Sequence, residues 1–355
     1  QEAVRLLNHD YMQSFTVNAE SRAQDLQKIS SYLEEKCQQD GTEFVYGRGR
    51  RKSKNQKYLE LFQRFRERQV TYNWHTASFQ GRNNYCKTDP DATFMHMKDD
   101  HMRNAQLKPG YNIQIGVDSE YIVSADVFQD RNDVWTLVPF LKMMDEKLWF
   151  RYPSVTADSG YESEEGYTYL RSSGQKPYIK PQTYEKWKKR SFKQDISKRE
   201  NMGYDKETDT YTCHAGKKLK ALFVKKQKSK SGYESEVTVY ECDDCTYCPH
   251  KEKCTRAKGN KRLYISKSFL EKRQESYENI LSETGIQYRM NRSIQVEGAF
   301  GVLKNDYEFQ RFLLRGKTKV KLEILLLCMG YNLNKLHAKI QKGRTRTYLF
   351  EVQSA

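Results

Sequence analysis

The chain has 355 residues, with 62 Lys and Arg against 46 Asp and Glu, a net charge of +16 and a pI near 9.3. Its 37% hydrophobic and 30% charged residues are typical of a soluble globular protein. The sequence contains no apolar run of 18 residues and no recognisable signal peptide, which argues against membrane proteins and secreted proteins. A nucleic-acid partner is the simplest explanation of this positive charge, and a basic solvated surface is the alternative.

The first part of the chain is predicted to be helical and basic. Residues 18–37 repeat apolar side chains at helical spacing, and Asn18 or Ser21 is the expected N-cap. Residues 56–69 form a second expected helix. The basic stretch between them, Gly47 to Lys54, is either a flexible surface loop or a phosphate contact. The chain begins at Gln1 rather than Met, so we expect that an upstream segment precedes it.

The middle of the chain changes to short strands. Five are predicted, at Tyr85–Thr88, Tyr111–Val117, Tyr121–Phe128, Ser154–Ala157 and Lys176–Lys180. Asp118, Ser119 and Glu120 suit a hairpin turn, and residues 133–148 carry one apolar stripe of a helix. Three meandering strands followed by crossovers indicate an α/β fold, a mixed sheet with flanking helices. This is the element order of the ribonuclease-H-like fold.

The rest of the chain divides into an insertion and two helices. Residues 181–285 hold a basic stretch and a cysteine cluster but few long periodic runs, which indicates an insertion domain. Helices are expected at about 287–304 and 318–341. The expected division is therefore a helical segment at 1–80, a catalytic domain at 81–180 completed by 286–345, and the insertion at 181–285.

Five of the eight cysteines cluster in the insertion. Cys242, Cys245, Cys248 and Cys254 follow the pattern C-x2-C-x2-C-x5-C, and Cys213 lies 29 residues before Cys242. Tetrahedral zinc sites use four such ligands. The preferred set is Cys213, Cys245, Cys248 and Cys254, with Cys242 as the substitute. A structural Zn²⁺ is therefore predicted, and reduced cysteines without metal are the alternative.

Three widely separated acidic residues suggest a metal-dependent reaction on phosphates, which needs carboxylates that converge on one or two divalent ions. The first candidate is Asp89 or Asp91 in TDPDATFM, the second is Asp158 after a strand, and the third is Glu297 on a late helix. With 46 acidic residues in the chain, spacing alone makes this set only one interpretation. Asp118, in a hairpin, and Asp133, at a helix start, are weaker candidates.

Four sequence blocks resemble the DDE transposases of bacterial insertion sequences, most closely the group numbered eleven-eighty-two. They are TDPDA, GYNIQIGVD, ADSGY and the tail from RSIQVEGAFGVLK to GYNLNKL, which together span about residues 85–340. The resemblance implies a ribonuclease-H-like catalytic domain, Mg²⁺ or Mn²⁺, and cleavage and strand transfer of double-stranded DNA. It also implies a bacterial cytoplasmic protein on the nucleoid that assembles as a homodimer on DNA.

Carried over by position, the resemblance gives Asp158 the second acidic role and Glu297 the third. Lys304, seven residues after Glu297 and two helical turns away, is an expected DNA contact, as are Arg315 and Lys317 of the RGK block. Related transposases place an Arg four residues before the Glu, but here Ser293 stands there and Arg292 lies one residue further back. Residues five apart in an α-helix point in directions about 140° apart, so we expect Arg292 to face away from Glu297.

Two other functions remain open at this stage. One is a DNA-binding protein derived from a transposase that has lost catalysis. The other is a metal-dependent nuclease that uses the same acidic site without strand transfer. The intact acidic set favours the enzyme over the binding protein.

Overall fold

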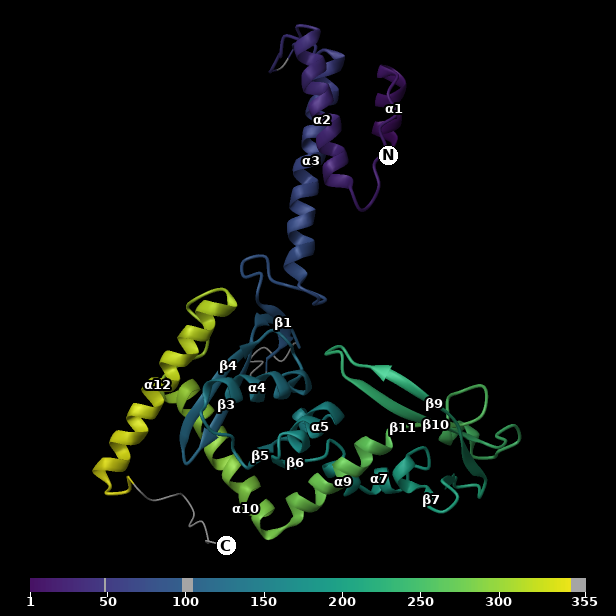
Figure 1. Cartoon of the computed structure of the whole chain (residues 1–355), viewed down its shortest axis with the longest axis vertical. Coiled ribbons are helices and arrows are strands. Elements are labelled where there is room, and N and C mark those ends of the chain that lie inside the picture. The colour runs from purple at the N-terminus through teal and green to yellow at the C-terminus, as the bar shows by residue number, and fades with distance from the viewer. Residues whose placement is uncertain (48, 98–104, 346–355) are drawn as a thin grey trace. The chain divides into compact units, whose positions relative to one another are not determined.

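The structure, a computed structural model, describes residues 1–47, 49–97 and 105–345. The chain separates into two compact units, Gln1–Phe94 and Met95–Ala355, here called the first and second units. Figure 1 draws both units. None of the helices in the described residues is both long and apolar enough to cross a membrane.

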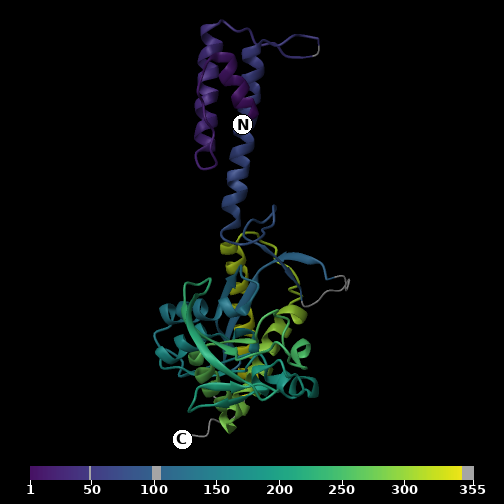
Figure 2. The ribbon, with the colours of Figure 1, turned by 90° about the vertical axis from the view of Figure 1, so that its right-hand side faces the viewer.

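The first unit is a helical bundle formed by α1 (Glu2–Tyr11), α2 (Arg22–Gln39) and α3 (Lys54–Phe79). Leu7, Ile29, Leu33 and Phe62 meet in its core, each fully buried. Helices α2 and α3 lie side by side in Figures 1 and 2. The sequence predicted α2 and part of α3, but it missed α1 and ended the second helix ten residues early.

The second unit contains a two-stranded antiparallel hairpin, β3 (Asn112–Asp118) and β4 (Tyr121–Phe128), turned at Ser119 and Glu120 with positive φ. Both strands and the turn confirm the sequence prediction. Helix α4 (Leu137–Lys147) packs on one face through Phe140 and Met144, which would contact a Cβ atom placed on Gly116. Helix α12 (Lys317–Gln341) packs on the other face (Figure 1).

Two polar side chains tie helices to strand edges. The Asn332 amide of α12 donates to the Ile122 carbonyl at 2.8 Å and accepts from the Ile122 N–H at 2.9 Å. The Ser276 hydroxyl of α9 (Lys267–Leu281) does the same with Ile179, at 2.9 and 3.0 Å. Each of these side chains therefore satisfies the backbone N–H and C=O of a residue on an edge strand. Without it, these groups would need water as their hydrogen-bond partner.

The strands β5 (Ser154–Ala157) and β6 (Lys176–Ile179) pair in parallel and are joined by α5 (Glu164–Ser172). Their positions match the sequence prediction, and α9 covers β6. The β3–β4 and β5–β6 pairs are separate in their hydrogen bonding. The second unit is thus a mixed α/β structure with helices on its strands, whereas a continuous ribonuclease-H-like sheet stays an expectation.

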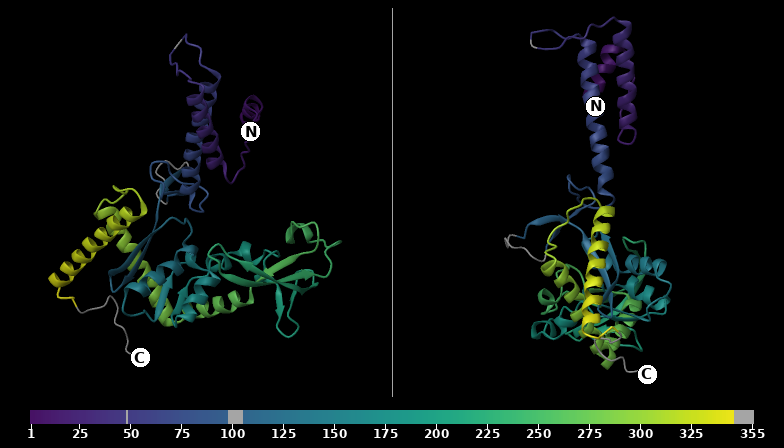
Figure 3. Two further views of the ribbon diagram at one scale, coloured as in Figure 1. Left: turned by 45° about the horizontal axis from the view of Figure 1, so that its top comes forward. Right: turned by 90° about the vertical axis from the view of Figure 1, so that its left-hand side faces the viewer.

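Residues 203–265 form an antiparallel sheet with the order β11-β10-β9-β8-β7 (Figure 3). Its strands are β7 (Gly203–Asp205), β8 (Thr210–Thr212), β9 (Lys218–Lys228), β10 (Glu234–Cys242) and β11 (Arg262–Ile265). The sequence analysis predicted none of them, because strongly exposed strands such as β9 lack the apolar alternation that marks a half-buried strand. Shorter elements complete the chain: β1 (Thr93–His96), β2 (Leu107–Gly110), α6 (Tyr184–Trp187), α7 (Arg190–Lys193) and α8 (Lys251–Cys254).

The expected helix at 287–304 is instead a composite. It runs through α10 (Glu283–Arg292), the π-helical turn η4 (Ser293–Glu297), α11 (Gly298–Gly301) and a second π-helical turn η5 (Val302–Asp306). Ser282 ends α9 and caps α10, with its hydroxyl accepting from the Gly285 N–H at 3.1 Å. A Cβ atom on Gly285 would lie 1.9 Å from the Asn279 carbonyl oxygen, so only glycine allows this close junction.

Candidate active site

Asp158 lies where the sequence analysis placed it, directly after β5. Its carboxylate accepts a 2.7 Å hydrogen bond from the Gly160 N–H and caps the short 3-10 turn Ser159–Tyr161. The side chain is thereby held at the carboxyl end of a parallel strand, the position where α/β proteins commonly place their functional groups.

Asp133 approaches the same point from the start of the segment that leads into α4. A Cβ atom on Gly160 would lie 3.0 Å from Oδ1 of Asp158 and 3.2 Å from Oδ2 of Asp133, so both carboxylates border this glycine. The other oxygen of Asp133 accepts hydrogen bonds from the amides of Asn112 (2.8 Å) and Gln114 (3.1 Å). The sequence analysis rated Asp133 as weak, because Asp is ordinary at a helix start and nothing local distinguishes it.

Tyr161 lies close enough to Asp133 and Asp158 for their charges to affect its pKa. Its hydroxyl donates to the side-chain carbonyl of Gln114, itself only 4% exposed. Burial raises the pKa of Tyr161, and the nearby negative charges of Asp133 and Asp158 raise it further. The phenol therefore stays protonated and donates to Gln114, whose amide in turn donates to Asp133.

Arg292 and Glu297 are brought together by the π-helical turn, which corrects the expectation that they face apart. Their side chains form an ion pair of 3.7 Å, with Arg292 25% and Glu297 66% exposed. A π-helix bonds residue i to i+5, so residues five apart lie nearly above each other. The angle predicted from an α-helix was wrong because residues 293–297 are not α-helical.

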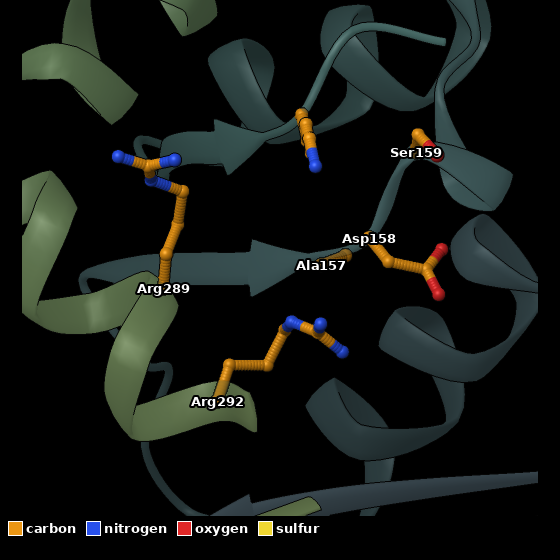
Figure 4. Close-up of a pocket in the computed structure, with 6 residues that line it drawn as sticks. Ala157, Asp158, Ser159, Arg289 and Arg292 are labelled. Atoms are coloured by element: carbon orange, nitrogen blue, oxygen red, sulfur yellow. The ribbon is translucent and has the colours of Figure 1, made fainter. Parts of the chain in front are cut away.

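A cavity of about 210 Å³ opens beside Asp158. It is lined by Ala157, Asp158, Ser159, Lys180, Arg289 and Arg292. Figure 4 shows both arginines projecting from α10 and Asp158 at the end of β5. Three cations and one carboxylate therefore surround a single hollow, which suits an anionic ligand beside an acidic residue.

The first acidic candidates lie in the first unit. Asp89 and Asp91 belong to a tight loop, closed by hydrogen bonds from the Cys86 N–H to the Ala92 carbonyl and from the Ala92 N–H to the Asp89 carbonyl. Arg82 holds the loop by donating to the carbonyls of Pro90 and Asp91, at 2.6 and 2.7 Å. The expected strand at 85–88 was wrong, because Lys87 and Thr88 turn the chain back and leave only a single bridge between Cys86 and Asp89.

No group of three or more His, Cys, Asp or Glu side chains in the described ranges is arranged to hold a metal ion. Asp133 and Asp158 form a pair, while Glu297 contacts Arg292. The convergence of Asp89 or Asp91 with Asp158 and Glu297 therefore stays a prediction.

The three expected DNA contacts lie around the end of the composite helix and the start of α12. Lys304 is exposed on η5 and Arg315 is exposed before α12. Lys317 is half-buried at the first position of α12, with its ammonium 5.9 Å from the centre of the Phe128 ring. Their exposure is compatible with phosphate contact, which stays a prediction.

The cysteine cluster lies at one end of the five-stranded sheet. Burial, followed by a hydrogen bond with Cys245, raises the pKa of the Cys242 thiol to about 12. The Lys261 N–H donates to the Cys245 sulfur at 3.4 Å, and the rings of His214 and His250 are 5.0 Å apart. All eight cysteines are free thiols. The five thiols of the cluster are neighbours, but in the described residues they do not form a metal-binding group. The geometry therefore does not support zinc.

The basic stretch of the insertion, Lys217 to Lys230, lies mostly on the β9–β10 hairpin. Lys217, Lys220, Lys228 and Lys230 are here called the ribbon lysines. Each pairs with a carboxylate. The partners are Asp244 at 3.0 Å, Asp243 at 3.1 Å, Glu234 at 3.5 Å and Asp130 at 3.1 Å. The pairing of these four favours the interpretation of a solvated surface, whereas Lys218, Lys225 and Lys226 of the same stretch form no ion pair within the described residues.

Comparison with known proteins gives one match. Residues 212–337 match the family model described as a transposase DDE domain. The match supports a DDE transposase. The matched range contains the cysteine cluster, Arg289, Glu297 and Lys304, whereas Asp158 lies before it. No curated protein matches the chain, and no solved structure matches it.

Proposed function

We propose that the protein is a DDE transposase that cuts DNA at the ends of an insertion sequence and joins those ends to target DNA. The match of residues 212–337 to a transposase DDE domain carries this proposal. The paired carboxylates Asp133 and Asp158 and the cation-lined cavity beside them support it, because phosphoryl transfer combines anion-holding cations with a carboxylate site.

The proposed metal is Mg²⁺ or Mn²⁺, held by Asp158 and Glu297 together with Asp89 or Asp91. Mg²⁺ often uses only one or two protein carboxylates and completes its shell with water and substrate phosphates. Asp158, fixed at the end of β5, can serve as one such carboxylate, while the described residues do not form a group of three ligands. A bound ion would supply charge stabilisation at the phosphate that is cut.

The protein's own groups would position the DNA. Arg292 lies next to Glu297 and lines the cavity beside Asp158, so one cation borders both acidic candidates. Lys304, Arg315 and Lys317 are proposed to contact backbone phosphates further along the duplex. The finer expectations belong to the same proposal: a ribonuclease-H-like catalytic domain, membership of the eleven-eighty-two group, a homodimer on DNA and a nucleoid-associated protein of the bacterial cytoplasm.

Cleavage of DNA that carries the ends of the protein's own element tests the proposal. We expect strand cleavage with Mg²⁺, none with EDTA, and restored cleavage when Mg²⁺ is added back. Asp158→Asn should cut more than about a hundredfold more slowly, since it loses the charge of a metal ligand and not merely a supporting contact. Transfer of the cut ends into a plasmid, scored on a gel, separates a transposase from a simple nuclease.

The alternative is a DNA-binding protein derived from a transposase without catalysis. It predicts DNA binding but no metal-dependent cleavage by the wild-type chain under any divalent ion. The acidic residues are all present, which favours the enzyme. A wild-type protein that binds element ends tightly and never cuts them would support the alternative.

We also propose a structural zinc ion at Cys213, Cys245, Cys248 and Cys254, with Cys242 as substitute. The spacing of these residues supports it, while within the described residues their placement does not form a metal-binding group. Elemental analysis should give about one zinc for each chain. A zinc-free protein that melts at the same temperature after chelation would overturn this proposal.

A further inference from the structure

The cavity beside Asp158 has an unbalanced lining. Lys180 follows the end of β6, Arg289 and Arg292 come from successive turns of α10, and Asp158 is the only acidic residue among the lining side chains. The end of β6 and helix α10 therefore bring three cations to one hollow, which Asp158 borders from the end of β5; Figure 4 shows the two arginines and Asp158. Such a convergence of like charges is costly unless an anion shares the space.

Arg289 gives the most specific sign of a ligand. Its Nε is buried and has no hydrogen-bond partner within the described part of the chain. A buried donor without a partner costs free energy, and most such donors in proteins are satisfied. An oxyanion in the cavity would accept this hydrogen bond, whereas an apolar ligand would leave the donor unsatisfied.

Lys180 and Arg292, the other two cations, already have partners but keep hydrogen-bond donors for an anion. Lys180 contacts Glu185 at 2.5 Å and lies 5.0 Å from the centre of the Tyr184 ring, and its ammonium can donate three hydrogen bonds. Arg292 is 3.7 Å from Glu297, which is an ion pair longer than a hydrogen bond. Neither contact saturates the donors that face the cavity.

The chemistry of this lining matches a phosphate group. Guanidinium groups bind phosphate oxygens through paired N–H donors, and lysine adds a compact charge. Since a water molecule takes about 30 Å³ of liquid, the cavity of about 210 Å³ has room for one tetrahedral oxyanion and accompanying water. The adjacent Asp158 carboxylate would repel a second negative group, which favours a single phosphate.

We propose that the cavity is a phosphate subsite in which Arg289 and Lys180 hold one phosphodiester of the DNA strand. This phosphate would be a neighbour of the one that is cut at Asp158, so the subsite sets the register of the strand. The assignment of this phosphate to DNA rests on the proposed function. Binding of a phosphate oxyanion does not, because free inorganic phosphate has the same chemistry. The subsite also needs no metal ion.

The first test uses inorganic phosphate and the whole chain without divalent ions. Arginine side-chain ¹⁵N NMR resolves Nε–H groups, and Arg289→Lys identifies the Arg289 signal by its loss. We expect phosphate to shift the Arg289 signal saturably, and Lys180→Gln to weaken that binding by about tenfold, the loss of one charge-assisted contact. Arg256→Gln removes an exposed arginine of the cysteine region and serves as the control for net charge.

The second test measures binding of an element-end duplex in EDTA at several salt concentrations. We expect Arg289→Gln to bind about tenfold more weakly than wild type, with a salt slope reduced by about one unit. Arg289→Lys keeps the charge, so its affinity for the duplex should lie between those of the wild type and Arg289→Gln. Arg256→Gln should stay within about twofold of wild type, as expected for an exposed charge with no defined contact. Equal melting temperatures would show that the variants are folded.

The outcomes separate this inference from the proposed function. A phosphate-induced shift of the Arg289 signal that Lys180→Gln weakens and Arg256→Gln leaves unchanged supports the subsite, even if the wild type never cuts DNA. An Arg289 signal that ignores phosphate, or folded Arg289→Gln that binds duplex like wild type, overturns the subsite even if cleavage is normal. Cleavage itself is decided by the metal assay and not by these measurements.

Discussion

The cavity beside Asp158 and the β9–β10 hairpin are both rich in positive charge, yet they use it differently. Each of the four ribbon lysines has a carboxylate partner within 3.5 Å, so the charges of these four side chains are balanced. The cavity gathers three cations around one carboxylate, and the buried Nε of Arg289 has no hydrogen-bond partner among the residues that the structure describes. We therefore propose that a polyanion binds at the cavity, where positive charge is locally in excess, rather than at the paired ribbon lysines.

The difference originates in the backbone that carries each group. An antiparallel ribbon places residues of both strands opposite one another, so Lys228 directly faces Glu234. Arg289 and Arg292 are instead brought over the ends of β5 and β6 by the close junction between α9 and α10. The junction depends on Gly285, and the π-helical turn after Arg292 then returns Glu297 to the same side.

The largest expected effect breaks this junction. Gly285→Ala would place a Cβ atom 1.9 Å from the Asn279 carbonyl oxygen and 2.8 Å from the Ile280 Cα, and the clashing atoms are backbone. We expect the free energy of unfolding to fall by about 3 kcal/mol or more, the upper range of overpacking. Urea denaturation of the two proteins measures this difference.

Gly301→Ala is the matched control, because a Cβ atom there meets nothing within 4 Å. Ala is the better helix former, so this variant should gain roughly 0.5–1 kcal/mol. If Gly285→Ala were as stable as wild type, the α9–α10 junction would not depend on glycine and the placement of both arginines would need another cause.

A smaller effect is expected for a cation outside the cavity. Lys304→Ala removes an exposed charge on η5, which we propose contacts a DNA phosphate. Affinity should fall, and the slope of log affinity against log salt should decrease by about one unit. Gel-shift titrations from low to moderate salt measure both quantities. An unchanged slope would remove Lys304 from the proposed DNA surface.

The smallest effect is expected on the hairpin. Lys228→Gln removes a ribbon lysine whose charge Glu234 already balances, so DNA affinity should change by less than about twofold, as for other exposed ion pairs. The same titrations apply. A loss of tenfold or more would show that the ribbon lysines bind DNA, and the contrast between the two charged regions would disappear.

Much of the second unit could be predicted from sequence. The strand boundaries of β4 and β5 match their predicted ranges, and α12 begins one residue before its predicted start. These elements bury one face, so their apolar residues alternate with the period of their secondary structure. The hairpin turn at Asp118–Glu120 and the position of Asp158 after β5 followed from the same patterns.

The parts that sequence could not give depend on contacts between distant residues. β9 is exposed along almost its whole length and has no apolar period, because pairing with β10 rather than burial forms it. The meeting of Asp133 with Asp158 depends on how the segment before α4 packs against Gly160. The π-helical turn at 293–297 has no local signature in SIQVE, so an α-helical angle gave the wrong face for Arg292.

Cleavage by Glu297→Ala most directly tests whether this chain is a DDE transposase. The measurement is single-turnover cleavage of element-end DNA with Mg²⁺, with DNA binding measured in the same samples. Glu271→Ala, which removes an equally exposed glutamate of α9, is the control. We predict that Glu297→Ala cuts more than about a hundredfold more slowly while binding DNA as tightly as wild type, and that Glu271→Ala cuts normally. Normal cleavage by folded Glu297→Ala would contradict the assignment of Glu297 as the third carboxylate and with it the DDE mechanism.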